Sequence, residues 1–373
     1  MNKKLLAVAV ASAVAAPMAA SADSSLTIYG GVGIAVESID NDVNDALGVN
    51  SNHSALGFEG STDINSDLAA VFHWDAFVGL DSGNAGGDSL IGTGRDGWAG
   101  LRGAFGTVAL GFQGRPWKTL SHALDPFEGT IADYSSVLGR SGQFEANGSG
   151  GGDGSFDTGI GNALIWFGPN INGFSWHVQY GAEETDGGAN NYGFQVNYSN
   201  DQFFIGASFD ENEDVGGTAP TFAGGNPTGS GDDETAIKLV GSVNFNNLTV
   251  TGAWEDLSGI GNIDGADRDA FWLAGTLNIG SGSIRASFIS ADDVDGVSDS
   301  GGDQFSVGWF GNLSDNATWY AIYSTIDNDS NASYGFRSDL STSNFDTSLE
   351  GQTGQDSDAI AVGIKYNFAA DLI

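Results

Sequence analysis

The chain has 373 residues and no cysteine, and its 48 acidic against 12 basic residues give a formal net charge of −36. This charge excludes nucleic acid as a partner, because phosphate groups need basic residues, and without cysteine the fold must be held by packing and backbone hydrogen bonds. With 58 glycines and only 6 prolines, long helices are disfavoured, and many strands joined by polar turns are expected.

The N-terminus has the pattern of a secretory signal peptide, which we predict to cover residues 1–22. A short positive region precedes an apolar run that ends before Pro17, and small residues follow up to Ala22. The apolar run is too short to cross a membrane as a helix, and the small residues fit a cleavage site. We therefore expect an exported mature chain, residues 23–373, that forms one domain.

The rest of the chain is rich in segments that alternate between apolar and small or polar residues, as β-strands with two different faces do. The last of them runs from Asp358 to Phe368, where every second residue is apolar. Sixteen such strands are predicted. They begin near Leu26, His53, Leu68, Arg95, Phe105, Asn162, Phe174, Asn191, Gln202, Thr235, Leu248, Asp269, Ser283, Gln304, Thr318 and Asp358.

The connections between these strands alternate in kind. Short turns, such as Gly103-Ala104 and Asn246-Asn247, alternate with long acidic segments, such as 210–233 and 327–357. This alternation is typical of membrane β-barrels. The charges gather in the long segments, so the polar faces of the strands consist mostly of small or uncharged residues.

The apolar faces end in aromatic residues, for example at Trp319, Tyr320 and Tyr366. Aromatic belts of this kind lie at the boundary between lipid and water. Because lipid offers no partner to a backbone amide, the strands must close into a ring. The predicted fold is therefore all-β, a 16-stranded antiparallel transmembrane β-barrel whose apolar face meets lipid.

Two neighbouring stretches resemble a known family. "SALGFEGSTDINSDLAAVFHWD" runs from Ser54 to Asp75, and "GRDGWAGLRGAFGTVALGFQ" runs from Gly94 to Gln113. Both are similar to early strands of the general diffusion porins of Gram-negative outer membranes, of the neisserial and enteric type. The resemblance implies a homotrimer in the cell outer membrane, in contact with its lipid and lipopolysaccharide. Each barrel would hold a water-filled pore for passive diffusion of ions and small hydrophilic solutes.

The resemblance also implies that the third long loop, residues 114 to about 162, folds into the barrel and narrows the pore. Its segment "DPFEGTIADYSSVLGR" is similar to the constriction segment of the family, in which loop carboxylates face wall arginines. Carried over by position, the pore constriction consists of the loop acids Asp125, Glu128 and Asp133 and the arginines Arg95 and Arg140.

The chain departs from the family pattern at both ends. Basic residues that the family often carries in its first two strands are replaced by Gly31 and by Ala55-Leu56. We therefore expect a cation-selective pore, because carboxylates along a narrow aqueous channel attract cations and repel anions. The family usually ends on a phenylalanine that assembly machinery reads, whereas five residues follow Phe368, so the terminal signal lies there or moves to Ile373.

Two other functions remain open beside the general pore. Trp117, Phe127 and Tyr134 in the inserted loop could form a track for sugars, as in a substrate-specific porin for oligosaccharides. They could equally pack the loop against the wall, which we favour. The remaining alternative is a surface β-protein whose loops bind a partner, such as an adhesin.

Metal binding and catalysis find little support in the sequence. The acidic runs Asp40–Asp45 and Asp327–Asn331 lack the glycine and glutamate that a calcium loop needs at its sixth and twelfth places, so polar turns are the better interpretation. Weak binding of Ca²⁺ or Mg²⁺ by acidic loops stays open, and no other cofactor is expected. Ser121 and His122 are adjacent, but adjacency alone does not make a hydrolase site, so an enzyme is not expected.

Overall fold

The computed structural model describes residues 24–81, 91–140, 156–182, 190–213, 232–336, 349 and 351–372. The predicted signal peptide lies outside these residues. No helix within the described ranges is both long and apolar enough to cross a membrane.

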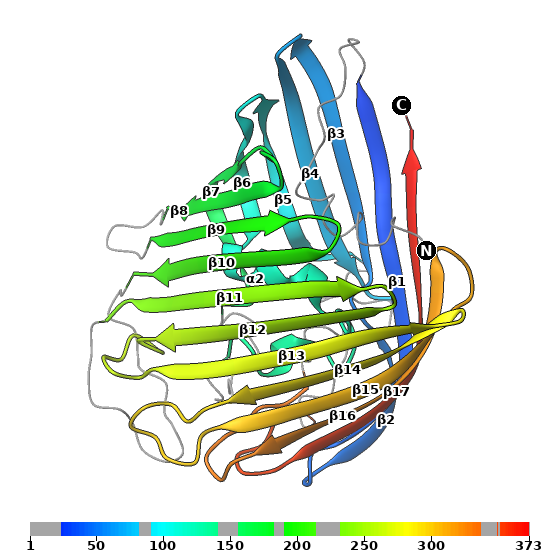
Figure 1. Ribbon diagram of the computed structural model, residues 1–373, viewed down its shortest axis with the longest axis vertical. Coiled ribbons are helices and arrows are strands. Elements are labelled where there is room, and N and C mark those ends of the chain that lie inside the picture. The colour runs from blue at the N-terminus through cyan, green and yellow to red at the C-terminus, as the bar shows by residue number, and fades with distance from the viewer. Residues whose placement is uncertain are drawn as a thin grey trace.

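The described residues contain seventeen strands, which form one antiparallel sheet (Figure 1). The strands are β1 (Ser25–Asp40), β2 (Asp45–Ser51), β3 (Ala55–Asn65), β4 (Leu68–Val78), β5 (Ile91–Gly103), β6 (Gly106–Gly114), β7 (Gly159–Phe167), β8 (Phe174–Gly181), β9 (Asn191–Ser199), β10 (Phe203–Asn212), β11 (Glu234–Phe245), β12 (Leu248–Ser258), β13 (Arg268–Ile279), β14 (Gly282–Ala291), β15 (Gly302–Asn312), β16 (Ala317–Asn328) and β17 (Ser357–Asp371). The helical segments are α2 (Pro116–Ser121), η1 (His122–Leu124) and η2 (Tyr134–Ser136).

The sheet closes on itself between its first and last strands. β1 pairs with β17 from Thr27 opposite Asp371 to Asp40 opposite Asp358. On its other edge β1 pairs with β2 along one half of its length and with β3 along the other half. β2 and β3 therefore share one place in the ring, and the predicted barrel of sixteen antiparallel strands is confirmed.

The break between β2 and β3 corrects the predicted start of the second strand. That start was placed at His53, whereas the strand begins at Asp45 and is interrupted around His53. His53 has a φ of 53°, a left-handed conformation that an extended strand cannot contain. The polar residues before it hid the first half of the strand, because they carry little of the alternation that marks the others.

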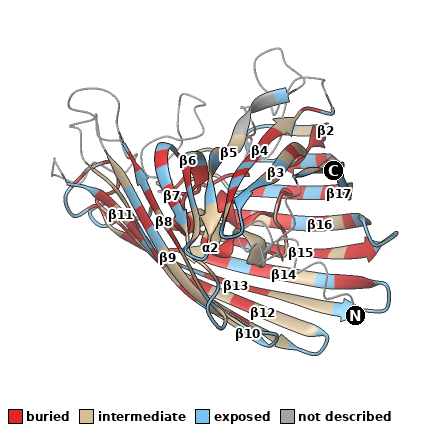
Figure 2. Ribbon diagram, turned by 90° about the horizontal axis from the view of Figure 1, so that it is seen from above, coloured by how far each residue is buried: buried red, intermediate tan, exposed pale blue. Residues whose placement is uncertain are grey.

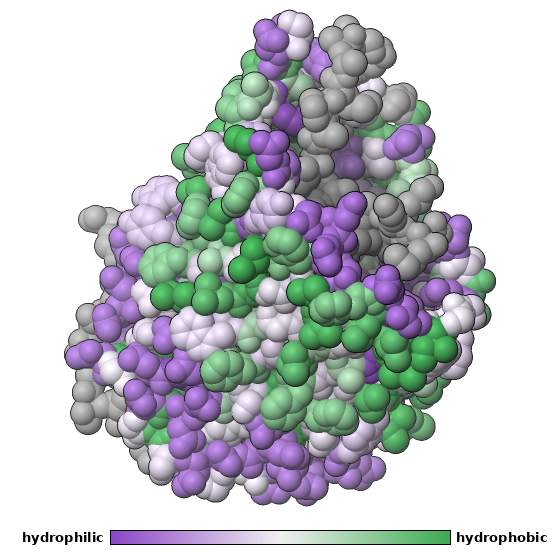
Figure 3. All heavy atoms as spheres, in the orientation of Figure 1, coloured by the Kyte–Doolittle hydropathy of each residue, from purple (hydrophilic) through white to green (hydrophobic). Residues whose placement is uncertain are grey.

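The two faces of the strands differ as the alternation predicts. On β13, Phe271 is 54% and Leu273 is 59% exposed on the outside, whereas the alternate residues Trp272 and Ala274 are buried toward the lumen. Figure 3 shows apolar residues gathered across the middle of the face that β9–β14 cover, with hydrophilic residues toward the lower left and the bottom of the molecule. An apolar outer belt of this kind matches a membrane barrel.

One aromatic residue lies on the opposite face from the prediction. Tyr320 was expected in the lipid-facing aromatic belt, but it is buried and its ring stacks on Phe310 at 5.6 Å. Its neighbour Trp319 is 39% exposed on the outside. Adjacent residues of a strand point to opposite faces, so only one of the pair can meet lipid.

The segment between β6 and β7, residues 115–158, is the inserted loop, and its described parts are 115–140 and 156–158. Figure 2 shows α2 of this loop lying inside the ring of strands. Its apolar side chains share one buried cluster with the inner faces of β11–β16. The hydrophobic core of the molecule therefore lies inside the barrel, between the inserted loop and one side of the wall.

The orientation of the strand faces predicts a large asymmetry between two lysine substitutions on β13. Leu273→Lys places a charge in lipid at mid-strand and should destabilise the barrel by about 2–4 kcal/mol. Thr276→Lys points into the aqueous lumen and should cost less than about 1 kcal/mol. Urea unfolding of the protein refolded into lipid vesicles measures both, and equal losses would contradict the assignment of the faces.

Candidate pore constriction

The inserted loop is anchored to the wall by hydrogen bonds from its backbone. The amide of Trp117 donates to Asp210 on β10 at 2.8 Å, and the amide of Gly139 donates to Glu255 on β12 at 2.9 Å. Lys238 on β11 donates to Ser121 Oγ at 2.7 Å and to the Trp117 carbonyl at 3.1 Å. Buried side chains of Asp210, Glu255 and Lys238 thus bind the backbone at both ends of the described loop.

The three aromatic residues of the inserted loop fill space against the wall. Trp117, Phe127 and Tyr134 are fully buried. The Phe127 ring contacts Phe310 on β15 with centroids 5.8 Å apart, and the Tyr134 ring contacts Trp272 on β13 at 5.3 Å. The packing interpretation is confirmed, because buried rings offer no face to a passing sugar.

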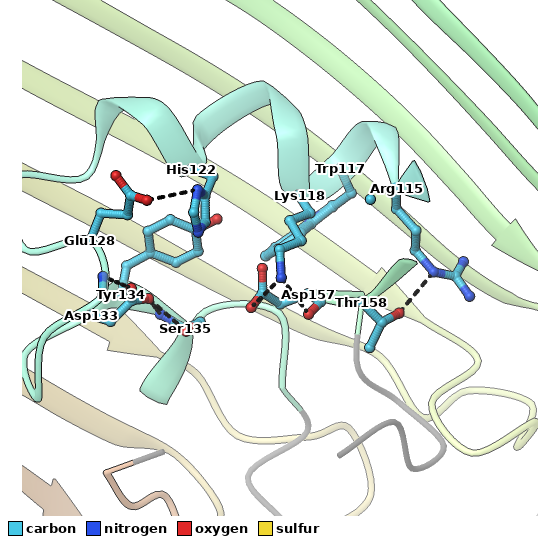
Figure 4. A network of polar contacts seen from close by, with 12 residues as sticks. Arg115, Trp117, Lys118, His122, Glu128, Asp133, Tyr134, Ser135, Asp157 and Thr158 are labelled. Atoms are coloured by element: carbon cyan, nitrogen blue, oxygen red, sulfur yellow. Dashed lines mark hydrogen bonds and ion pairs between the residues drawn. The ribbon is translucent and has the colours of Figure 1, made fainter. Parts of the chain in front are cut away.

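Two of the three loop acids shape the loop itself. Asp125 accepts hydrogen bonds from the amides of Phe127 and Tyr134, at 2.8 and 3.0 Å. Asp133 accepts from the amides of Gly129 and Ser135, at 2.8 and 3.0 Å (Figure 4). Both side chains are buried. Burial, followed by the nearby Asp133 carboxylate, raises the pKa of Asp125 well above its ordinary value, which leaves less negative charge there than the sequence suggests.

Glu128 is the loop acid that faces open space, with its side chain 40% exposed. Its Oε1 lies 3.5 Å from Nδ1 of His53 and 3.5 Å from Nδ1 of His122. Figure 4 shows the contact with His122, which comes from the end of α2. Burial alone would raise the pKa of Glu128, but the positive field of its neighbours, His122 and Lys365 foremost, lowers it. The carboxylate is therefore ionised at neutral pH.

The two predicted arginines lie at different places. Arg95 on β5 contributes to the positive field at Glu128, and its guanidinium lies over the Phe77 ring, 4.9 Å from the centroid. Arg140 follows Gly139, whose amide binds Glu255, and it interacts electrostatically with Tyr334. Arg95 on the wall thus acts on Glu128 through its electric field, whereas Arg140 belongs to the inserted loop itself.

Two wall cations beside the loop tip were missing from the sequence prediction. Lys365 on β17 donates to the carbonyl of Glu128, and Arg285 on β14 donates to the carbonyl of Pro126. Lys365 pairs across the sheet with Gly33, two residues from Gly31, where the sequence departs from the family pattern. The wall thus has positive charge that sequence analysis did not count. The sequence pattern that could have revealed these two residues is a single basic residue on the lumen-facing side of β14 and of β17, where most other residues are small or polar.

Further basic residues gather at the same level of the barrel. Arg115 and Lys118 belong to the inserted loop, where Lys118 pairs with Asp157 at 3.6 Å. Arg268 on β13 pairs with the buried Glu255 at 2.7 Å, the same carboxylate that holds Gly139. Within the described ranges, most of the basic side chains therefore lie around the inserted loop.

The acidic runs considered for calcium form polar turns. The Asp40 carboxylate accepts from the amide of Asp42 at 2.9 Å, and the Asn41 side chain accepts from the amide of Asn44 at 2.8 Å. In the second run, the amide of Ala332 donates to the carbonyl of Asp329 at 3.0 Å, which closes a backbone turn. The bonds of the first run are the ordinary chemistry of Asx turns, and both runs form polar turns as predicted.

The close approach of Gly129 to His53 predicts a specific defect at the loop tip. A methyl group on Gly129 would lie 2.6 Å from Cβ of His53, and the residue has a φ of 59°. Gly129→Ala should therefore cost about 1–2 kcal/mol for the left-handed backbone and should also displace the tip, which changes the single-channel conductance.

Gly265→Ala is the matched control, since Gly265 has a φ of 74° with no atom within 4 Å of the added methyl group. It should cost a similar backbone strain and leave the conductance unchanged. Planar-bilayer recordings and urea unfolding compare the two variants, and an unaltered conductance in Gly129→Ala would contradict the predicted displacement.

Comparisons with known proteins place this geometry in a family. A family model of the Gram-negative porins matches residues 7–331. Comparison with the curated proteins gave no match. The anion-selective porin from Comamonas acidovorans is 21% identical with a TM-score of 0.75, over 93% of this chain and 100% of that chain.

Two further solved porins show the same fold. The trimer form of OmpT, an outer membrane protein of Vibrio cholerae, is 17% identical with a TM-score of 0.64, over 92% of this chain and 99% of that chain. OmpF of Salmonella typhi, in complex with daunomycin, is 15% identical with a TM-score of 0.61, over 92% and 97%. With the closed barrel and its inserted loop, the family match shows that this chain belongs to the Gram-negative porins and forms a porin-type channel of the outer membrane.

Proposed function

We propose that the mature chain, residues 23–373, forms a general diffusion channel for ions and small hydrophilic solutes. The observation that carries this proposal is the inserted loop, which is packed on one side of the wall. In the described part of its tip, Glu128 presents an exposed carboxylate among basic side chains of the wall. A lumen narrowed in this way sorts solutes by size and charge. We further propose a homotrimer in outer-membrane lipid, an assembly that the trimer form of OmpT supports by fold.

We propose that the constriction is formed by one loop acid and two basic residues of the wall. Glu128 on the loop tip and Arg95 and Lys365 on the wall supply the charges that a passing ion meets. Asp125 and Asp133 keep the tip folded and contribute less to the field, because their carboxylates are turned onto backbone amides. Opposite charges on facing sides of a narrow lumen create a transverse field that orients polar solutes.

A channel specific for oligosaccharides is the weaker candidate. A row of rings, Tyr29, His73 and Trp98, crosses the inner wall, and such rings could bind sugars. However, Tyr29 and His73 stack with centroids 5.7 Å apart, and His73 and Trp98 stack at 5.4 Å. Rings that face one another have less surface left for a sugar, so the general pore is favoured.

The sign of ion selectivity depends on two regions with opposite charge. Basic side chains of the protein gather at the constriction. Acidic residues crowd the ends of the strands that carry the long loops, for example at Asp269, Asp292, Asp303 and Asp327. The similar porin from Comamonas acidovorans is anion-selective, so the fold leaves the sign open. We propose that the acidic mouth makes this channel cation-selective at low salt.

The cation preference should fall as salt rises. The Debye length shrinks from about 30 Å at 0.01 M to about 3 Å at 1 M salt, so the mouth loses its influence at high salt first. Reversal potentials in KCl gradients, recorded at low and high mean concentration, measure this change. Anion preference at low salt would refute the proposed sign.

Two charge-neutralising substitutions in the inserted loop test the constriction. Glu128→Gln removes the exposed carboxylate and should shift the reversal potential toward anions. Asp133→Asn is the matched control, since it removes one charge from a buried carboxylate of the same loop and should shift the potential much less. A liposome-swelling assay on the same proteins confirms that each still forms a pore. Equal shifts of the reversal potential in the two variants would show that the Glu128 carboxylate affects ion selectivity no more than the buried Asp133 carboxylate does.

A further inference from the structure

Three side chains from separate parts of the chain converge at the tip of the inserted loop. His53 lies in the break between β2 and β3, His122 begins η1, and Glu128 lies in the turn that follows. One ring nitrogen of each histidine and a carboxylate oxygen of Glu128 all lie within 4.8 Å of one another. The two imidazole rings meet edge to face, with centroids 5.5 Å apart.

These distances are close to those of a metal site. Zn²⁺ holds nitrogen and oxygen ligands at about 2.0–2.2 Å, so neighbouring ligand atoms of a tetrahedral site lie about 3.4 Å apart. Both Nδ1 atoms are already 3.5 Å from the same Glu128 oxygen. Three protein ligands leave a fourth position for water from the lumen.

We propose that His53, His122 and Glu128 bind a borderline divalent transition metal such as Zn²⁺ and that the bound ion obstructs the pore. The inference rests on the pore proposed above. Glu128 would supply a carboxylate oxygen, and each imidazole would supply the lone pair of Nδ1 when its single ring proton is on Nε2. Imidazole with one carboxylate is a ligand set that suits zinc, copper and nickel.

The surroundings select against hard cations. Ca²⁺ and Mg²⁺ need several oxygen ligands, and this cluster offers one carboxylate. Lys365, Arg95 and Lys118 add positive charge nearby, which opposes any cation that forms no bonds to the imidazoles. Each of these three has another partner: Lys365 binds the Glu128 carbonyl, Arg95 lies over Phe77, and Lys118 pairs with Asp157. The imidazole nitrogens are thus left to the metal.

A second group, His73, Asp75 and Asp96, also lies within ligand distance, and it serves as an internal control. Its carboxylates accept backbone hydrogen bonds, Asp75 from the Asp96 amide at 2.9 Å and Asp96 from the Gly114 amide at 2.8 Å. The His73 ring lies between Tyr29 and Trp98. These engagements leave the second group less free to close around an ion.

The experiment is a planar-bilayer recording of the purified protein during a titration with ZnCl₂, followed by EDTA. Zn²⁺ should reduce the current reversibly, whereas MgCl₂ at the same concentrations should not. His53→Ala and His122→Ala should each raise the half-blocking Zn²⁺ concentration by about tenfold or more. Loss of a residue that only hydrogen-bonds to a metal ligand already lowers metal affinity by about 10–100-fold, and these variants remove a ligand itself. His73→Ala should leave it unchanged. Each variant is normalised to its own current before Zn²⁺ is added, which also reports whether it forms a channel.

The outcomes separate this inference from the proposed function. A wild-type channel that Zn²⁺ does not block, a block of equal strength in all three histidine variants, or an equal block by Mg²⁺ would overturn the metal site and leave the pore intact. A block lost in His73→Ala and kept in His53→Ala would assign the ion to the second group. The absence of any channel in metal-free buffer would refute the pore itself.

Discussion

The structure depends on one constraint, which is that a strand in hydrocarbon cannot leave its backbone amides and carbonyls without partners. A sheet meets that requirement only when it has no free edge, and the register of β1 against β17 removes the edge over fourteen residue pairs. Closure also fixes which face of each strand meets lipid, since alternate side chains of a closed sheet point outward and inward. The apolar belt and the polar lumen are therefore two consequences of the same ring.

A sixteen-stranded ring leaves more space inside than wall side chains can fill, and the inserted loop occupies part of it. The loop is a polar backbone in a cavity, so its amides and carbonyls need partners as well. Wall carboxylates at Asp210 and Glu255 accept from its amides, while Lys238, Arg285 and Lys365 donate to its carbonyls. This requirement explains why several of the few basic residues that the structure describes lie at the level of the loop. The cations that hold the loop are also those nearest to its exposed acid.

Most of the fold could be predicted from the sequence, because alternation is a local signal that each strand carries for itself. The predicted starts of strands at Leu68, Phe174, Asn191 and Leu248 coincide with observed ones. The prediction went wrong where the signal is interrupted, at the left-handed His53, and where adjacent aromatics compete for one face, at Trp319 and Tyr320.

The site was less predictable, since it depends on which side chains converge from distant strands. The inserted loop and its acids could be placed by resemblance to the porins, and the charge of Arg95 contributes to the field at Glu128. The path of the loop decides whether a carboxylate turns toward the lumen or accepts hydrogen bonds from backbone amides. Glu128 turns toward the lumen, whereas Asp125 and Asp133 bind backbone amides. The partners Lys365 and Arg285 lie more than 150 residues along the chain from the loop tip, and only the closure of the ring brings them there.

The central claim is that the tip of the inserted loop borders the open channel while the rest of the loop is packed away from it. The chain has no cysteine, so a single introduced thiol reports on its own position. The most direct measurement is single-channel current before and after a charged, water-soluble thiol reagent is added to Glu128→Cys and Asp133→Cys. The account predicts a stepwise fall of current in Glu128→Cys and little change in Asp133→Cys. A current in Glu128→Cys that the reagent leaves unaltered, with the thiol shown to be modified, would contradict it.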